Sequence, residues 1–384
     1  MKVLILGGDG YLGWPTAMHF SNLGHEVAIV DNLSKRSWEA EIGALPLWPI
    51  PTLQKRVLLW KKFTDFTIKP YIGNLTNHRF VYKVFDSFRP DTIIHYGEQP
   101  SAPFSMIDRE HAVATQENNI TGTLNVLFAM KSYVPSAHLI KLGSMGEYGT
   151  PNIDIEEGWL DVEHKGRKDR VLYPKKPGSF YHLSKVHDSH NIEFACRVWN
   201  MAATDLNQGV VYGIRTNETS IHPDLRTSFH YDEVFGTALN RFCVQAVAGI
   251  PLTVYGKGGQ QRGFLNIRDT LKCVELAATV PARAGEFRVF NQFTEVFSVL
   301  DLAETVVAAA KKIGIKAELQ NTENPRIEQE THYYNPRHTA LLALGLNPHI
   351  LSDELIHSML KRILESKDEI EKTVILPTIK WKYN

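Results

Sequence analysis

The chain has 384 residues, enough for one large domain or two smaller ones, each with its own core. Its 42 Lys and Arg residues balance 42 Asp and Glu residues, which argues against the net field that draws proteins to nucleic acid or an anionic membrane. We therefore expect a small-molecule partner, no nucleic acid and no membrane.

Short apolar segments rich in β-branched residues alternate with segments of helical period through the first 208 residues. We expect strands at residues 2–6, 26–31, 69–73, 91–96, 138–143 and 202–208. Strands that alternate with crossover helices predict an α/β fold, a doubly wound parallel sheet of the Rossmann type. Residues 37–67 contain three prolines and no clean period, and we interpret them as an insertion after the second strand.

The pattern changes after Gln208, where loops lengthen and Gly and Pro cluster between residues 249 and 263. Mixed short elements of this kind usually cap the open end of a nucleotide-binding sheet. We therefore predict a nucleotide-binding domain at 1–208 and a smaller substrate-binding region at 209–384. The boundary is soft, and the chain is free to cross between the two regions more than once.

The N-terminus has no basic and apolar leader, and no window approaches the length of a membrane-spanning helix. We expect a cytoplasmic protein. Cys196, Cys243 and Cys273 lie far apart without metal-ligand spacing, so we expect reduced core thiols and no metal site.

The first chemical signal is LGGDGYLG, which holds Gly7, Gly10 and Gly13 between an apolar strand and a helix. Glycine allows a tight turn and close approach of a pyrophosphate, and the helix N-terminus supplies free N–H groups. The second strand ends in Asp31, at the distance where a carboxylate binds the ribose hydroxyls of NAD and repels a 2′-phosphate. Arg36, a positive charge nearby, argues instead for NADP. The alternative is a Gly-rich loop of another α/β protein.

The second signal is SFYHLSKVH, in which Tyr181 and Lys185 share one face of a helix because they are four residues apart. A nearby ammonium and a positive nicotinamide ring favour the phenolate and would lower the pKa of Tyr181. Such a phenolate takes a proton from a sugar hydroxyl while hydride leaves the carbon for NAD. Ser144, at the end of the fifth predicted strand, is a candidate hydroxyl donor beside it.

Several long segments carry a family resemblance, among them GGDGYLGWPTA, HYGEQPSAPFSMIDR, KLGSMGEYGTPNIDIEEG and SFYHLSKVHDSHNI. Over nearly its whole length the chain resembles extended short-chain dehydrogenases/reductases of the nucleotide-sugar epimerase and dehydratase group. It is most similar to the family of UDP-sulfoquinovose synthases. The resemblance implies bound NAD, UDP-glucose and sulfite or a sulfite donor. It also implies oxidation at C4, loss of water across C5 and C6, sulfite addition at C6 and return of hydride to C4.

Within that resemblance, Tyr181 is the base for the 4-hydroxyl, Lys185 tunes it and holds the nicotinamide ribose, and Ser144 binds the C4 oxygen. The remaining predicted contacts fall into two groups. For the cofactor they are Tyr11, Leu12, Asn32, Arg36, Asn74, Leu75, Tyr96, Gly97, Glu98 and Asn118, and for the substrate they are Gln208, Val254, Tyr255, Arg262 and Arg326.

The chain departs from the pattern at three places. The family usually has threonine where this chain has Ser144. Related 4,6-dehydratases carry an Asp-Glu pair where this chain has Met145 and Gly146, so the acid/base work at C5 and C6 must come from elsewhere. His182 is our candidate because imidazole titrates in the useful range. A structural histidine and Glu147 are the alternatives.

The third departure is Pro100, where plant-type synthases have an arginine after GEQ. Arg109, His95 and main-chain N–H groups are the alternatives for the contact that this arginine makes.

Two other functions compete with the synthase. One is a UDP-hexose 4-epimerase or 4,6-dehydratase without sulfite chemistry, and the other is a catalytically silent NAD-binding regulator. The basic and aromatic segment at residues 56–63 is better explained as an amphipathic lid, with Leu58, Leu59 and Phe63 packed, than as a nucleic-acid surface. We expect helices at residues 118–132 and 181–198 to form the interface of a homodimer or higher homo-oligomer.

Overall fold

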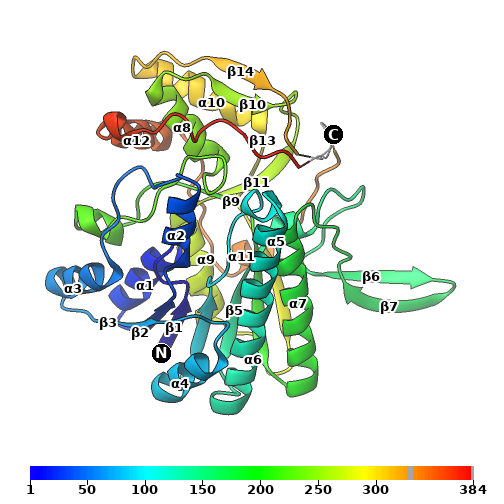
Figure 1. Cartoon of the computed structure of the whole chain (residues 1–384). Coiled ribbons are helices and arrows are strands. Elements are labelled where there is room, and N and C mark those ends of the chain that lie inside the picture. The colour runs from blue at the N-terminus through cyan, green and yellow to red at the C-terminus, as the bar shows by residue number, and fades with distance from the viewer. Residues whose placement is uncertain (327–331, 382–384) are drawn as a thin grey trace.

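A parallel sheet of seven strands forms the centre of the molecule (Figure 1). The computed structural model describes residues 1–326 and 332–381. The strands lie in the order β12, β8, β5, β4, β1, β2, β3. Their bounds are Lys2–Leu6 (β1), Glu26–Asp31 (β2), Ile68–Ile72 (β3), Thr92–His95 (β4), His138–Ser144 (β5), Ala202–Gln208 (β8) and Phe287–Gln292 (β12).

The sheet confirms the predicted α/β fold of the Rossmann type. Each of the six predicted strands is present, with its ends within one residue of the prediction. The strand order reverses between β1 and β4, and such a switch point is where open α/β sheets bind ligands. The seventh strand, β12, comes from beyond residue 208, so the chain returns to the large sheet after it has left it.

Helices cover both faces of the sheet, and each face has its own apolar core. One face carries α4 (His78–Phe88), α6 (Gly122–Tyr133) and α7 (Phe180–Trp199); a π-helical turn, Glu117–Thr121, joins α6 to α5 (Arg109–Gln116) (Figure 1). The other face carries α1 (Gly13–Asn22), α3 (Leu53–Thr64), α9 (Ile267–Thr279) and α11 (Ala340–Ala343).

The predicted insertion is largely helical, because α2 (Ser34–Glu41) and α3 lie on either side of a loop. The expected packing of α3 was confirmed for Leu59, which packs against the core of that face, but was wrong for Leu58 and Phe63. Leu58 and Phe63 are 69% and 43% exposed, whereas Leu53, Arg56 and Trp60 are buried. Arg56 takes a core position because its guanidinium pairs with Asp9 of the glycine loop, so a charged residue faces inward where sequence reasoning expected apolar ones.

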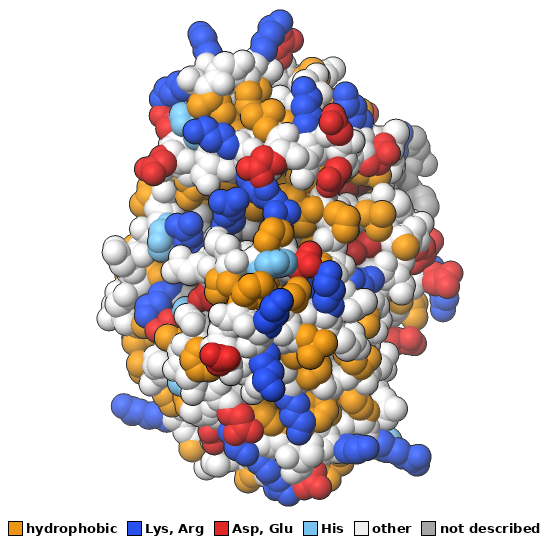
Figure 2. All heavy atoms as spheres, turned by 90° about the vertical axis from the view of Figure 1, so that its left-hand side faces the viewer, with side chains coloured by type: hydrophobic (Ala, Val, Ile, Leu, Met, Phe, Trp, Pro, Cys, Tyr) orange, Lys and Arg blue, Asp and Glu red, His pale blue; other side chains and the backbone are white. Residues whose placement is uncertain are grey.

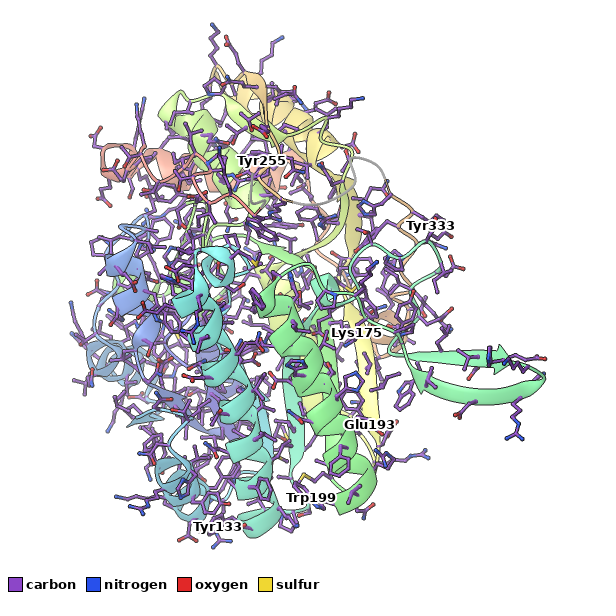
Figure 3. All side chains as sticks on the ribbon, turned by 45° about the vertical axis from the view of Figure 1, so that its right-hand side comes forward. Tyr133, Lys175, Glu193, Trp199, Tyr255 and Tyr333 are labelled. Atoms are coloured by element: carbon purple, nitrogen blue, oxygen red, sulfur yellow. The ribbon has the colours of Figure 1, made fainter. Side chains whose placement is uncertain are left out.

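A smaller region with a separate core lies above the sheet (Figure 1). Three helices pack in it: α8 (Ala238–Ala248), α10 (Val299–Lys312) and α12 (Asp353–Leu364). Its strands are β9 (Val210–Tyr212), β11 (Gln261–Asn266) and β13 (Glu295–Ser298) in one sheet, and β10 (Leu252–Tyr255) with β14 (Leu319–Thr322) in another. A charged hairpin, β6 (Trp159–His164) and β7 (Arg167–Leu172), projects from the body (Figures 1 and 3).

Within the described residues, no helix is long and apolar enough to cross a bilayer. Cys196, Cys243 and Cys273 are buried and unpaired with one another, as expected of core thiols. The face shown in Figure 2 intersperses basic, acidic and apolar side chains, in line with the balanced composition.

Candidate active site

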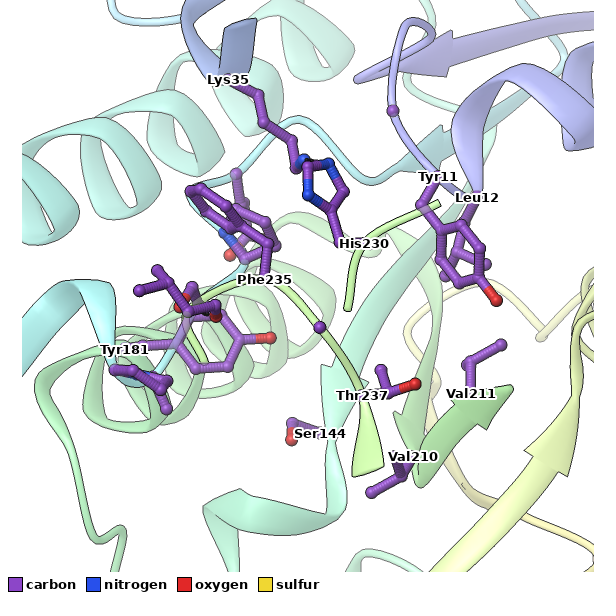
Figure 4. A pocket seen from close by; sticks show the side chains of 18 of the residues that line it. Tyr11, Leu12, Lys35, Ser144, Tyr181, Val210, Val211, His230, Phe235 and Thr237 are labelled. Atoms are coloured by element: carbon purple, nitrogen blue, oxygen red, sulfur yellow. Dashed lines mark hydrogen bonds between the residues drawn. The ribbon is translucent and has the colours of Figure 1, made fainter. Parts of the chain in front are cut away.

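A cavity of about 1390 Å³ lies between the sheet and the smaller region. It exceeds the roughly 300–1,000 Å³ typical of a pocket for one small ligand, so it has room for a dinucleotide together with a sugar nucleotide. The glycine loop and Asp31 line one part of it, and Ser144, Tyr181 and His182 line another. Figure 4 shows Tyr181 and Ser144 projecting into the same space.

The glycine loop fits a dinucleotide. Gly7 has a φ of +83°, and a Cβ carbon there would stand 2.7 Å from the carbonyl carbon of Tyr96. A Cβ carbon at Gly13 would collide with the carbonyl oxygen of Gly7, whereas at Gly10 the nearest atom would be 3.6 Å away. Gly7 and Gly13 therefore bring strand and helix together, and Gly10 leaves open backbone facing the cavity. The N-cap of α1 is Leu12, which has no side-chain acceptor for the first N–H groups. The N–H of Trp14 donates to the carbonyl oxygen of Gly10, so the N–H groups of Leu12 and Gly13 are the ones offered to a phosphate.

Asp31 lies at the cavity wall at the end of β2. Its two carboxylate oxygens accept hydrogen bonds from the backbone N–H groups of Asp9 and Leu33, at 2.8 and 2.7 Å. These bonds fix the carboxylate where ribose hydroxyls would meet it. Arg36 lines the cavity, but its donors are used by Asp9 and by the carbonyl oxygens of residues 50 and 51. The guanidinium is therefore held within the protein, which favours NAD over NADP at this end.

Lys185 lies behind the cavity wall and is not among the described residues that line the cavity. Its Nζ donates to the carbonyl oxygen of Leu142 at 2.6 Å and stands 2.8 Å from Oε2 of Glu98. The ammonium is 5.7 Å from the ring centre of Tyr181. The prediction that Tyr181 and Lys185 share one helix face was correct. Lys185 and Glu98 were predicted as two separate cofactor contacts, and their ion pair was not expected.

The pKa of Tyr181 is raised above its ordinary value, not lowered. Burial is the main cause, and the carboxylates of Glu98 and Glu147 add to it, with Lys141 opposing them. In the protein alone, burial outweighs the lysine, whose charge is matched by Glu98 at 2.8 Å. The predicted lowering also relied on the positive nicotinamide ring, so for the cofactor-bound protein it stays a prediction.

Ser144 ends β5 and begins a capping box with Glu147. Its Oγ accepts from the backbone N–H of Gly146 at 3.1 Å, which leaves the hydroxyl proton to donate into the cavity. Glu147 is fully buried, bonded to the Ser144 N–H and paired with Lys141 and Lys175. Burial alone would raise the pKa of Glu147, but the two ammonium groups outweigh it and lower the pKa to about 2. Glu147 thus anchors the loop as a permanent anion.

His182 and Gly146 are in direct contact. A Cβ carbon at position 146 would collide with the imidazole Nε2, so the ring fills the space above the loop. The other nitrogen, Nδ1, lies 2.9 Å from Oγ of Ser179, and the ring is 5.0 Å from that of Tyr181. Burial, then Arg326 and Arg262, lower the pKa of His182 to about 4. The imidazole is neutral near pH 7 and suited to accept a proton.

Most other predicted contacts line the cavity. Two do not, within the residues that the structure describes. Asn74 is exposed, and its side chain closes a turn by accepting from the N–H of Thr76. Val254 is fully buried in the core of the smaller region, because β10 turns its neighbour Tyr255 to the cavity instead. The residues in place are Tyr11, Leu12, Asn32, Leu75, Tyr96, Gly97, Asn118, Gln208, Arg262 and Arg326.

Neither side chain considered as a substitute for the arginine missing at Pro100 reaches the cavity. His95 is fully buried in β4, where it contacts Thr123, and burial lowers its pKa to about 4. Arg109 is exposed at the start of α5. Pro100 itself lines the cavity.

Sequence reasoning missed a polar cluster on the opposite wall. Lys35 contacts Glu39 and His230, and Phe235 lies under its ammonium at 4.5 Å (Figure 4). Arg241 of α8 also lines the cavity, 5.2 Å from the ring of Tyr255. These residues come from segments far apart in sequence, so no local motif marks them. The helical spacing of Lys35 and Glu39 was the one available signal.

Comparison with known proteins agrees with the site. Residues 3–291 match the model of the NAD dependent epimerase/dehydratase family. The chain is 56% identical over 381 residues to the chloroplastic UDP-sulfoquinovose synthase of Spinacia oleracea, covering 99% of this chain and 79% of that one. It is 44% identical over 385 residues to the UDP-sulfoquinovose synthase of Sulfolobus acidocaldarius, covering 100% and 98%.

Among solved structures, UDP-glucose 4-epimerase from Bifidobacterium longum, in complex with NAD+ and UDP, matches the fold. The TM-score is 0.70 at 18% identity, and the match covers 96% of this chain and 99% of that chain. The chain belongs to the NAD-dependent epimerase/dehydratase family, and its cofactor is NAD. Within that family it belongs with the UDP-sulfoquinovose synthases.

Proposed function

We propose that the chain converts UDP-glucose and sulfite to UDP-sulfoquinovose and water. The observation that carries the proposal is the position of His182, a neutral imidazole beside Tyr181 that fills the space over Gly146. It provides an acid/base group at a hydride-transfer site that lacks the acidic pair of the dehydratases. The whole-length identity to two synthases supports the same reaction.

NAD, when bound, accepts hydride from C4 of the sugar and returns it at the end. Tyr181 takes the proton of the 4-hydroxyl, and Ser144 donates a hydrogen bond to the same oxygen as it becomes a ketone. Ser144 is ready for this task because Gly146 N–H satisfies its acceptor side.

His182 takes the proton at C5, which the neighbouring ketone makes acidic. His182 passes this proton to the 6-hydroxyl as the C6–O bond breaks, so that water leaves. The conjugated enone then accepts the sulfur lone pair of hydrogen sulfite at C6, so that a C–S bond replaces the C–O bond, and the proton of hydrogen sulfite passes through His182 to C5. The pKa of His182, about 4, leaves the imidazole unprotonated when the sugar binds, so its nitrogen is free to accept the C5 proton.

The sugar nucleotide is held from the smaller region. Arg262 of β11 and Arg326 line the cavity, and both lie close enough to His182 to lower its pKa. Guanidinium groups suit a diphosphate because their planar fork binds two oxygens at once. Tyr255 and Gln208 line the same space and would meet the uridine and the sugar.

We also propose a homodimer through α6 and α7. Their outer faces expose Leu124 and Phe128 on one helix and Phe194 and Val198 on the other. The two helices pack side by side on one face of the molecule (Figure 1). An exposed apolar patch of this kind favours a second copy, which would bury it. Sedimentation of a Phe128→Glu, Phe194→Glu variant as a monomer would support the interface, and unchanged sedimentation would contradict it.

The experiment that tests the function is incubation of purified protein with UDP-glucose and sulfite, followed by mass spectrometry of the nucleotide sugars. The expected product carries a sulfonate in place of the 6-hydroxyl. Omission of sulfite should leave UDP-glucose without net conversion. Formation of UDP-galactose alone would identify a 4-epimerase instead. No substrate-dependent change in the absorbance of the bound nicotinamide would identify a silent NAD-binding protein.

A further inference from the structure

The interior behind Tyr181 holds an ion pair that the proposed reaction does not itself require. Lys185 and Glu98 stand 2.8 Å apart with side chains only 3% and 1% exposed. Glu98 follows β4 directly, whereas Lys185 comes from α7, so the pair ties the helix that carries the base to the sheet edge. Neither carboxylate oxygen of Glu98 has a hydrogen-bond partner among the described residues, so the 2.8 Å contact of Oε2 with Lys185 is an ion pair.

We propose that Glu98 is a positioning residue: its carboxylate holds the Lys185 ammonium behind the cavity wall and keeps Tyr181 in its phenol form until the positive charge of the cofactor arrives. This inference rests on the role of Tyr181 as base, which is part of the proposed function. The proposal concerns three side chains of the protein itself: Glu98, Lys185 and Tyr181.

Other charged groups act on Glu98 less directly than Lys185 does; Lys141 also attracts it, since Glu98 is among the carboxylates that raise the pKa of Lys141. Asp188 of α7 is fully buried, and burial together with the charge of Glu98 raises its pKa well above the ordinary value, which favours the neutral acid. His95 of β4 is neutral as well, since burial lowers its pKa to about 4. Among the described residues, Lys185 is thus the cation that pairs directly with Glu98, at 2.8 Å.

The other charges near Tyr181 are committed elsewhere. Lys141 of β5 lies between Glu147 and Asp205, at 3.4 and 3.3 Å, and donates to Oγ of Ser189. Its positive charge is shared by two carboxylates. What distinguishes Glu98 is that it both opposes ionisation of Tyr181 and neutralises the lysine expected to favour it.

Removal of the Glu98 charge should therefore make Tyr181 ionise more easily. A neighbouring charge shifts a pKa by about 1–3 units, and in Glu98→Gln the loss of repulsion and the release of the Lys185 charge act in the same direction. The acid limb of the pH–rate profile for sugar oxidation should move to lower pH by at least about one unit. Glu98→Asp, which keeps the charge, should hold the limb within half that shift. Asp188→Asn, which replaces a neutral acid by its isostere, is the matched control and should leave the limb in place.

A second measurement needs no turnover. The ultraviolet absorbance of tyrosinate, taken as the difference between the parent protein and Tyr181→Phe, titrates this phenol alone. In protein stripped of NAD we expect no ionisation of Tyr181 below the ordinary tyrosine value of about 10, and in Glu98→Gln we expect ionisation at lower pH. An acid limb that is the same in Glu98→Gln and the parent would overturn the proposal. If Glu98→Gln does not fold, ionisation of Tyr181 near neutral pH in the stripped parent would overturn it equally. A shifted titration without sulfonated product would keep this inference and reject only the proposed function.

Discussion

The imidazole of His182 occupies the space into which any side chain at position 146 would project. The two residues come from different elements, a helix and the loop after β5, and they meet beside Tyr181. Glycine is therefore needed at position 146 to leave room for the ring and not for its backbone conformation, because its φ is not in the left-handed region. The absence of a side chain at Gly146 is what makes room for the imidazole of His182.

Gly146→Ala should displace the imidazole and impair proton transfer at C5. General acid–base catalysis contributes about 10²–10⁴-fold, so we expect overall turnover to fall by at least about 10²-fold while NAD stays bound. Steady-state turnover and the NAD content of the purified protein are the measurements. Gly178→Ala is the control, since a Cβ carbon there would meet no atom within 4 Å. Equal turnover in both variants would show that the ring has room to move and that its position is not critical.

His182→Ala should abolish exchange of the C5 hydrogen with solvent deuterium but allow oxidation at C4. His182→Gln keeps a polar side chain without a titrating group and should behave in the same way. Because burial and the neighbouring arginines lower the pKa of His182 to about 4, the imidazole loses competence as a base only when pH falls through that value. Undiminished exchange in the Ala variant would remove His182 from the reaction and leave it a structural residue bonded to Ser179.

Tyr181→Phe should stop sugar oxidation and leave NAD binding intact. The backbone N–H of Tyr181 donates to Oγ of Ser105 at 3.0 Å, and this bond survives the substitution, so the start of α7 should keep its place. We expect no rise in reduced-nicotinamide absorbance on addition of UDP-glucose, with a loss of at least about 10²-fold. A Phe variant that still reduced the bound cofactor would contradict the assignment of the base.

The sheet and the glycine loop were predictable because their signals are local. Apolar β-branched segments marked six strands, and three glycines between a strand and a helix marked the dinucleotide site. Tyr181 and Lys185 were found by their helical spacing, and the lack of an acidic side chain at Gly146 pointed to His182. The strands, the glycine loop and the Tyr181–Lys185 pair were each inferred from residues within one or two consecutive elements, whereas His182 was inferred from the family resemblance.

The remaining features depend on contacts between distant segments. Glu98 sits in a loop with no charge pattern, and only the fold brings it to Lys185. Val254 and Tyr255 are adjacent, but strand alternation, which needs the position of β10, decides that Tyr255 alone faces the cavity. Arg56 resembled a surface residue of an amphipathic helix until the glycine loop supplied its partner, Asp9. Local patterns carry no information about such partners.

Asp9→Asn should destabilise the fold strongly. Asp9 pairs with Arg56, which is fully buried, and with Arg36. Without the carboxylate, the guanidinium of Arg56 becomes an uncompensated charge in the core, which costs about 3–5 kcal/mol. Asp224→Asn is the matched control, because it removes the partner of Lys55 on the same helix in an exposed pair, 57% and 35% exposed, worth about 0–1 kcal/mol. Urea unfolding of both variants gives the comparison, and equal losses would contradict the role of the buried pair.

The same pair predicts a pH dependence with a definite sign. Burial opposes ionisation of Asp9, but Arg36 and Arg56 outweigh it and lower the pKa below the ordinary value. A carboxyl group whose folded pKa is depressed stabilises the protein above its unfolded value of about 3.9, and that contribution is lost as pH falls through the folded value. The parent should therefore lose stability more steeply than Asp9→Asn over the interval that begins at about pH 4 and extends downward to the folded pKa. Parallel losses of unfolding free energy in the two proteins over that interval would show that Arg36 and Arg56 do not lower the pKa of Asp9.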